Sequence, residues 1–174
     1  YKDFLGTYHM AREEGVENIN VDLISGIPMQ TVDSWERTLR SVAELGPEHI
    51  SAYSLIIEEG TPFYERYRQS PDAAGRCLAE LPGEEEERRM YHETETILEE
   101  YGYHRYEISN YAREGYECRH NLGYWERAEY LGIGAGAASL INNMRQIEGE
   151  APERLSKKDC MEEYMFLGLR KTAG

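Results

Sequence analysis

The hydrophobic and polar positions in the first third of the chain predict a helix and then a strand–helix–strand succession. Apolar residues recur at helical spacing up to Gly15, a residue that readily ends a helix. Residues 19–25 then alternate between apolar and polar side chains, as a half-buried strand does. Thr31 is a candidate N-cap for an amphipathic helix, and residues 50–56 form a second apolar run. The pattern therefore predicts a βαβ unit with parallel strands and a right-handed crossover.

The middle of the chain predicts one long helix and a further strand. An apolar stripe after Gly83 indicates a helix that runs to Tyr101, and the acidic residues 84–87 are interpreted as its solvated first turn. Arginines that follow at the spacing of one helical turn support that interpretation. Residues 106–109 are expected to form a third strand, which would complete a second repeat.

Beyond this strand the regular pattern is lost. We expect a pocket-like loop and a glycine-rich turn, followed by a hairpin over residues 137–146 with Asn142 and Asn143 at its tip. Residues 152–155 are expected to be a linker. Ser156, with an aspartate three residues on, then opens a final amphipathic helix.

The amino-acid composition disfavours two classes of protein, those that span a membrane and those that bind nucleic acid. The chain has 174 residues, is 40% hydrophobic and carries a net charge of −14. No apolar run approaches membrane-spanning length, and the acidity disfavours nucleic acid as a partner, since its binding depends on Lys and Arg. The chain opens directly into a helical pattern, without an initiator Met or a signal-peptide core. We therefore expect an internal piece of a longer protein.

Cysteine usage points to a reducing compartment and hence to the cytoplasm. The three cysteines, Cys77, Cys118 and Cys160, are odd in number and far apart. Since no close-spaced cysteine motif occurs, the chain alone cannot supply a zinc knuckle or an iron–sulfur cluster.

Asp22 and a group of three glycines can each be interpreted either as part of a ligand-binding site or as a structural feature. Asp22 lies opposite the apolar face of its strand, where a carboxylate can accept hydrogen bonds from ribose hydroxyls or an amine, or can cap a neighbouring loop. Gly132, Gly134 and Gly136 indicate either a close backbone approach or a plain tight turn. The strand, helix and acidic residue of a dinucleotide-binding motif are missing around them.

The most informative stretch is residues 118–125, which places His120 among amide and aromatic side chains. The combination is typical of a pocket for a flat, large, partly apolar ligand. Imidazole can ligate a metal or haem iron, although a lone histidine is more often structural. Tyr124 and Trp125 can stack on a porphyrin face or belong to a core. The other four histidines form no paired metal motif.

Four stretches together resemble one family. They are residues 22–31 (DLISGIPMQT), 49–55 with 58–62 (HISAYSL, EEGTP), 106–112 (YEISNYA) and 120–125 (HNLGYW). These motifs resemble the HemW branch of the radical S-adenosylmethionine superfamily, which is related to oxygen-independent coproporphyrinogen III oxidase (HemN).

The resemblance implies an α/β fold that is part of a partial (β/α)6, TIM-like barrel. Residues 1–115 would be the C-terminal part of that barrel, and residues 116–150 would hold the HNxxYW segment, the glycine-rich turn and the hairpin. Residues 151–174 would be a linker and the first helix of a further helical domain. Full-length relatives carry a CxxxCxxC motif for a [4Fe–4S] cluster that binds S-adenosylmethionine, and those cysteines are absent here.

The resemblance also implies site residues. Asp22 matches an S-adenosylmethionine-contacting aspartate, and Ile56 and Ala138 fall near two further contact positions. The haem-binding motif falls on His120, Asn121, Tyr124 and Trp125, with His120 as the iron ligand. No catalytic residue is implied.

This sequence departs from the family pattern at three positions. Met29 stands where glycine is usual, and Ala138 and Leu140 replace the His and Tyr of a common GAHSY turn. The change at Ala138 removes one candidate haem ligand.

The hypothesis that follows is a haem-binding chaperone of HemW type, with haem or porphyrin and a haem-acceptor protein as partners. An oxidoreductase of the coproporphyrinogen III oxidase type and an inactive scaffold are the alternatives. The chain alone is predicted to perform no radical chemistry. Because half a barrel leaves a strand edge exposed, we also expect self-association.

Overall fold

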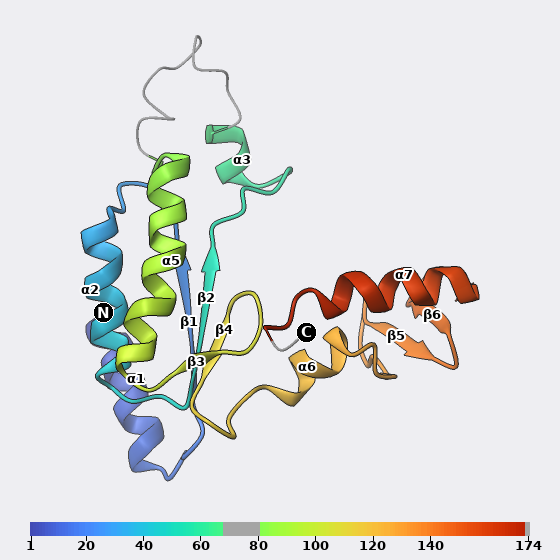
Figure 1. Ribbon diagram of the computed structural model, residues 1–174, viewed down its shortest axis with the longest axis horizontal. Helices are drawn as coiled ribbons and strands as arrows, with labels where there is room; N and C mark the ends of the chain where they lie inside the picture. The colour runs from blue at the N-terminus through green and yellow to red at the C-terminus, as the bar shows by residue number, and fades with distance from the viewer. Residues whose placement is uncertain (68–80, 173–174) are drawn as a thin grey trace. The chain divides into compact units, whose positions relative to one another are not determined.

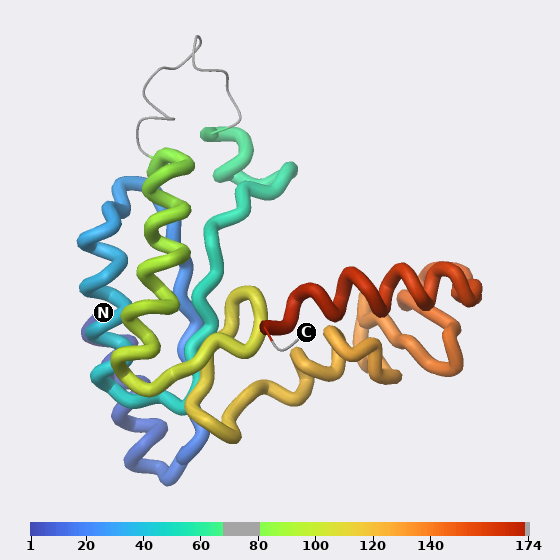
Figure 2. Tube along the Cα trace, viewed as in Figure 1, coloured from blue at the N-terminus to red at the C-terminus, as the bar shows by residue number. Residues whose placement is uncertain are grey.

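The computed structural model describes residues 1–67 and 81–172, and Cys77 lies outside them. The chain divides into two compact units, which are described separately (Figures 1 and 2). Unit 1 comprises Tyr1–Arg105 and Ser109–Tyr116, and unit 2 comprises Tyr106–Ile108 and Glu117–Gly174. Within the described residues, no helix combines the length and the apolar character that crossing a membrane requires.

Unit 1 is a four-stranded sheet with helices, and its elements follow the predicted succession. The helices are α1 (Lys2–Glu13), α2 (Val32–Ala43), α3 (Pro62–Tyr67) and α5 (Glu84–Glu100). The strands are β1 (Asn20–Ser25), β2 (His49–Ser54), β3 (His104–Arg105) and β4 (Asn110–Ala112), in the sheet order β1-β2-β4-β3. Strands β1 and β2 are parallel, which confirms the βαβ unit.

Several local predictions for unit 1 are confirmed. Thr31 caps α2, because its side-chain oxygen accepts a hydrogen bond from the Ser34 N–H at 3.2 Å. Gly15 follows α1 with φ of +84°, a conformation that glycine adopts without strain. The acidic first turn of α5 is solvated, and Glu84 pairs with Arg88 at 3.5 Å.

The two faces of the sheet differ because strand residues alternate in direction. Val21 and Ile50 are paired in register and belong to the core that packs against α2 and α5. The indole N–H of Trp35 on α2 donates to Thr94 Oγ1 on α5 at 2.9 Å, which satisfies its one polar atom within that core. Figure 1 shows α2 and α5 side by side against the sheet. The opposite face carries a polar set: Asn20, Asp22, His49, Ser51 and Asn110.

The prediction of a third strand over residues 106–109 was wrong. The chain instead forms a short antiparallel pair, β3 and β4, on either side of this segment, and β4 runs antiparallel to β2. The physical reason is that the side chains of Tyr106 and Glu107 hydrogen-bond with residues of unit 2. Residues 106–108 are therefore withdrawn from the sheet, whereas the Ser109 carbonyl still accepts from the Ala52 N–H of β2 at 2.8 Å. Within the described residues, β1 and β2 are the parallel pair, and no second parallel repeat forms.

Unit 2 contains two helices and a second sheet. Its elements are α6 (Arg119–Trp125), β5 (Ala138–Ile141), β6 (Met144–Ile147), β7 (Glu153–Arg154) and α7 (Lys157–Gly168). The hairpin is confirmed, since β5 and β6 pair antiparallel and Asn142 and Asn143 have positive φ, as a tight hairpin turn requires. Ser156 caps α7 together with Asp159, as predicted.

Two predictions for unit 2 were wrong. The expected linker over residues 152–155 contains β7, because the buried Leu155 donates its N–H to the Asn143 carbonyl at 2.9 Å and draws the segment onto β6. The expected pocket-like loop over residues 118–125 is the helix α6. Its backbone bonds start at the Cys118 carbonyl, which accepts from the Leu122 N–H at 3.0 Å.

Candidate functional site

Asp22 lies on the polar face of β1 and ends a chain of side-chain hydrogen bonds. Its carboxylate accepts from Asn20 Nδ2 at 2.7 Å, and Asn20 Oδ1 lies 2.6 Å from His49 Nδ1 and 3.3 Å from Ser51 Oγ. A carboxylate only accepts, so the amide nitrogen of Asn20 must face Asp22. The amide oxygen therefore faces His49, and Nδ1 of that imidazole carries the proton. Within the described residues, the Asp22 carboxylate is exposed and caps no loop.

The other two residues matched to S-adenosylmethionine contacts lie elsewhere. Ile56 follows the carboxyl end of β2, and its side chain is 78% exposed. Ala138 opens β5 and belongs to unit 2. The structure thus places Asp22 and Ile56 in unit 1 and Ala138 in unit 2.

Helix α6 presents His120 and Tyr124 together. These residues are four positions apart, which places them on one stripe of the helix. Their rings meet edge to face with centroids 4.7 Å apart, and Tyr124 meets Tyr130 in the same way, also at 4.7 Å. All three line a cavity of about 210 Å³ with Arg119, Gly123, Ala128 and Glu129. His120 and Tyr124 are exposed, so this aromatic wall faces solvent.

The side chains on the neighbouring stripe of α6, Asn121 and Trp125, form hydrogen bonds with other residues of unit 2. Trp125 Nε1 donates to Glu107 Oε2 at 2.9 Å, and Glu107 is 1% exposed. The Asn121 side chain hydrogen-bonds with the hydroxyl of Tyr106, which also accepts from the Cys118 N–H at 3.2 Å. Burial raises the pKa of Tyr106 to about 12, and these two hydrogen bonds offset only part of the rise.

Sequence reasoning missed Tyr130 and the roles of Tyr106 and Glu107. Tyr130 reaches the aromatic wall only because its backbone bridges to Leu140 of the hairpin. No spacing in the sequence signals such a contact. For Glu107 a signal does exist, since it stands between the aromatic Tyr106 and the apolar Ile108, and an acidic residue that is buried needs a hydrogen-bonding partner.

The first glycine of the glycine-rich turn, Gly132, lies where the turn backbone comes very close to the backbone of β5. A Cβ on Gly132 would lie 2.2 Å from the Ala138 carbonyl oxygen, and the Gly132 N–H donates to Ser139 Oγ at 2.9 Å. Gly134 and Gly136 have φ of +110° and +72°. The close approach is therefore confirmed at Gly132, where the approaching partner is β5, whereas Gly134 and Gly136 fit the tight-turn interpretation, because a Cβ on either would meet no atom within 4 Å.

A half-buried ion-pair network holds α7 to the hairpin. Glu163 on α7 accepts from Arg127 Nε at 2.9 Å and from the guanidinium of Arg145 on β6. Burial raises the pKa of Glu163, but the two arginines outweigh it, so the pKa lies below its ordinary value. The network is the main polar link between α7 and β6.

With this geometry established, the chain can be compared with known proteins. No protein-family model matches it. It is 40% identical to the haem chaperone HemW of Bacillus subtilis over 190 aligned positions, which cover 99% of this chain and 48% of that protein. The HemW haem chaperone of Lactococcus lactis is 38% identical, with 94% and 45% covered. A mitochondrial radical S-adenosyl methionine domain-containing protein of Danio rerio is 35% identical, with 76% and 28% covered.

A solved structure has a similar fold. Coproporphyrinogen III oxidase (HemN) from Escherichia coli, a radical SAM enzyme, superposes with a TM-score of 0.70 at 24% identity, covering 97% of this chain and 44% of that chain. The chain belongs to the HemW-like, HemN-related radical S-adenosylmethionine family. This confirms the expected α/β fold, part of a radical SAM barrel. The chain spans about half the length of the curated HemW relatives that it matches first.

The close approach at Gly132 can be tested by adding one methyl group. Gly132→Ala is expected to destabilise the chain by about 1–3 kcal/mol, because its Cβ meets a backbone oxygen that cannot move without distorting β5. The measurement is urea unfolding followed by circular dichroism. Gly168→Ala is the matched control in the same unit, since a Cβ there meets no atom within 4 Å. Equal stability of the two variants would contradict the close approach.

The Glu163 network predicts a pH dependence of stability. The folded-state pKa of Glu163 lies below the ordinary value of 4.5, so the stabilisation is complete above that value and is lost as the pH falls through the lower, folded pKa. Glu163→Gln should cost about 1–3 kcal/mol at neutral pH. It should also flatten this acid limb in urea unfolding midpoints measured between pH 7 and pH 3, whereas the exposed Glu162→Gln control should retain it. An unchanged acid limb in Glu163→Gln would exclude the network as its source.

Proposed function

We propose that this chain forms the haem-facing part of a haem-binding chaperone, with His120 as the iron ligand and Tyr124 as a wall against the porphyrin. The observation that carries the proposal is the exposed imidazole of His120, held edge-on to Tyr124 at the rim of a cavity. The chain's HemW relatives are named haem chaperones, which supports the same assignment.

The chemistry of the exposed stripe fits haem. Imidazole is a frequent axial ligand of haem iron, and, within the described part of the chain, neither ring nitrogen of His120 has a hydrogen-bond partner. The rings of Tyr124 and Tyr130 add flat apolar surface next to it. The cavity of about 210 Å³ is smaller than enclosed ligand sites usually are. A ligand held on one side only can be passed on, which suits delivery of haem to an acceptor protein.

The family resemblance implies two further groups in the longer protein, S-adenosylmethionine and a [4Fe–4S] cluster. The residues of this chain fit the first of them. The exposed, oriented carboxylate of Asp22 would accept hydrogen bonds from the ribose hydroxyls of S-adenosylmethionine. The [4Fe–4S] cluster expected in the longer protein would take its ligands from elsewhere in that protein, because the described residues contain no group of three or more His, Cys, Asp or Glu that could hold a metal ion. The sequence also lacks a CxxxCxxC motif. We assign no step of radical chemistry to this chain.

A haem titration followed by absorbance spectroscopy tests the proposal. Added haem should shift the Soret band of the chain, and His120→Ala should lose the imidazole-ligated spectrum and bind haem at least tenfold more weakly, roughly the effect of losing one strong contact. His92→Ala is the matched control, because His92 is also exposed on a helix and edge-on to a tyrosine, Tyr91, at 5.7 Å. That variant should bind as the unmodified chain does.

Two outcomes would contradict the proposal. No Soret shift in the unmodified chain would reject haem binding. A shift that His120→Ala leaves unchanged would keep haem binding but assign the iron to another ligand.

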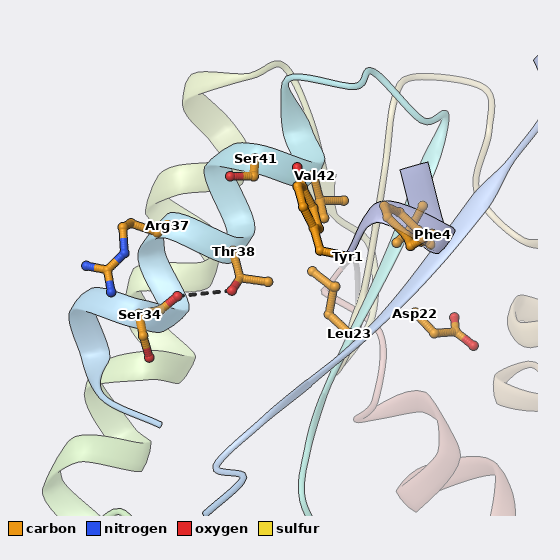
Figure 3. Close-up of a pocket in the computed structure, with 10 residues that line it drawn as sticks. Tyr1, Phe4, Asp22, Leu23, Ser34, Arg37, Thr38, Ser41 and Val42 are labelled. Atoms are coloured by element: carbon orange, nitrogen blue, oxygen red, sulfur yellow. Dashed lines mark hydrogen bonds between the residues drawn. The ribbon is translucent and has the colours of Figure 1, made fainter. Parts of the chain in front are cut away.

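We also propose that the isolated chain pairs with a second copy along β1. Within the described residues β1 has a strand neighbour only on its β2 side, and a groove of about 420 Å³ lies beside it. Figure 3 shows Leu23 and Phe4 near Tyr1 in this groove, while Asp22 points away. The groove therefore joins a bare strand edge to apolar surface, a combination that favours strand pairing between molecules.

Size-exclusion chromatography with light scattering tests this pairing. The unmodified chain is expected to run as a dimer at micromolar concentration. Phe4→Glu should shift it to the monomer, because a buried carboxylate in the groove opposes association. Met10→Glu, on an exposed part of the same helix, should leave the dimer intact. A monomeric unmodified chain would refute the pairing.

A further inference from the structure

The HNxxYW segment is divided between two stripes of α6. In a helix, residues four apart lie on one stripe, so His120 pairs with Tyr124 and Asn121 pairs with Trp125. The first pair is exposed and meets through ring contacts. The side chains of the second pair bond within unit 2. The two stripes therefore have different environments, although the motif is continuous in the sequence.

The bonds of Trp125 fix the rotation of α6. Its N–H donates to Glu107, a carboxylate that is 1% exposed, and the guanidinium of Arg170 lies 4.8 Å from its ring centroid. Releasing Trp125 would take a hydrogen-bond donor from a buried carboxylate, which is costly. The Trp125 side chain is thus held by two groups, the carboxylate of Glu107 and the guanidinium of Arg170.

The bonds of Asn121 and Cys118 fix the other end of the helix. The Cys118 N–H donates to the hydroxyl of Tyr106 at 3.2 Å, and the Asn121 side chain hydrogen-bonds with the same hydroxyl; Tyr106 is 7% exposed. Tyr106 and Glu107 are adjacent in the sequence, so one short segment holds both ends of α6. Its backbone is itself held, because the Thr172 N–H donates to the Tyr106 carbonyl at 3.2 Å.

We infer that Asn121 and Trp125 are positioning residues, which orient α6 through Tyr106 and Glu107 so that His120 faces the ligand, and that they do not touch haem. This inference rests on the proposed function and deepens it. Within the HNxxYW segment it assigns the ligand contact to His120 and Tyr124, and it assigns to the buried Glu107 the role of fixing the orientation of the helix.

A double-mutant experiment on the full chain separates positioning from contact. Trp125→Phe keeps the ring but removes the donor to Glu107. It should weaken haem binding about fivefold to tenfold and reduce the imidazole-ligated fraction of the Soret spectrum, as expected for one lost hydrogen bond to a charged group. In the His120→Ala background the same substitution should change haem affinity by less than about twofold, because a residue that acts through another has no effect without it.

Two further variants distinguish a loss of positioning from a loss of the fold. Tyr106→Phe removes only the hydroxyl at the other end of α6 and should reproduce the loss of the imidazole-ligated fraction. Glu107→Gln keeps an oxygen that accepts from Trp125 and should retain most of it. Circular dichroism of each variant shows whether the fold is kept.

The possible results are distinct. Absence of a Soret shift in the unmodified chain would overturn both this inference and the proposed function. A shift that depends on His120 but is unaffected by Trp125→Phe and Tyr106→Phe would overturn only the positioning role. An equal loss caused by Trp125→Phe with and without His120 would also overturn it, because it would show that Trp125 contacts haem directly.

Discussion

The hydrogen bond from Trp125 to the buried carboxylate of Glu107 is the constraint on which the arrangement of unit 2 depends. A carboxylate removed from water needs donors, and the indole N–H supplies one at 2.9 Å. The bond ties residues 106–108 to α6, although their neighbours in the sequence belong to strands of unit 1. It also decides which stripe of α6 is left exposed.

Unit 1 depends on a simpler rule, the parallel in-register pairing of β1 and β2. The pairing aligns Val21 with Ile50 toward the helices and aligns Asp22 with Ser51 on the opposite face. Because the apolar residues fill one face, the other is free to carry amide, hydroxyl, imidazole and carboxylate groups. The hydrogen-bond chain from His49 through Asn20 to Asp22 follows directly from this alternation.

The departures from the family pattern have a structural meaning as well. Leu140, in place of a polar aromatic residue, is 4% exposed and bridges to Tyr130, so it supports the aromatic wall from behind. Ala138 has its carbonyl oxygen against Gly132. These two positions thus serve the packing of the hairpin.

The sequence by itself determined the elements whose cause is local. The helix caps at Thr31 and Ser156 and the Asn142–Asn143 hairpin follow from side chains a few residues apart, and all three are confirmed. The motifs also identified the family, since short runs of specific residues persist when the rest of a sequence changes.

Only the tertiary structure decided what depends on distant partners. The segment 106–109 has the pattern of a strand, but Tyr106 and Glu107 hydrogen-bond with Cys118 and Trp125, which lie more than ten residues further along the chain. Residues 106–108 are thereby withdrawn from the sheet. In the same way the spacing of HNxxYW is helical, yet which stripe of that helix faces solvent is set by the buried Glu107. The local pattern fixes the helical conformation of this segment, whereas the hydrogen bond from Trp125 to the buried Glu107 fixes the orientation of the helix within unit 2.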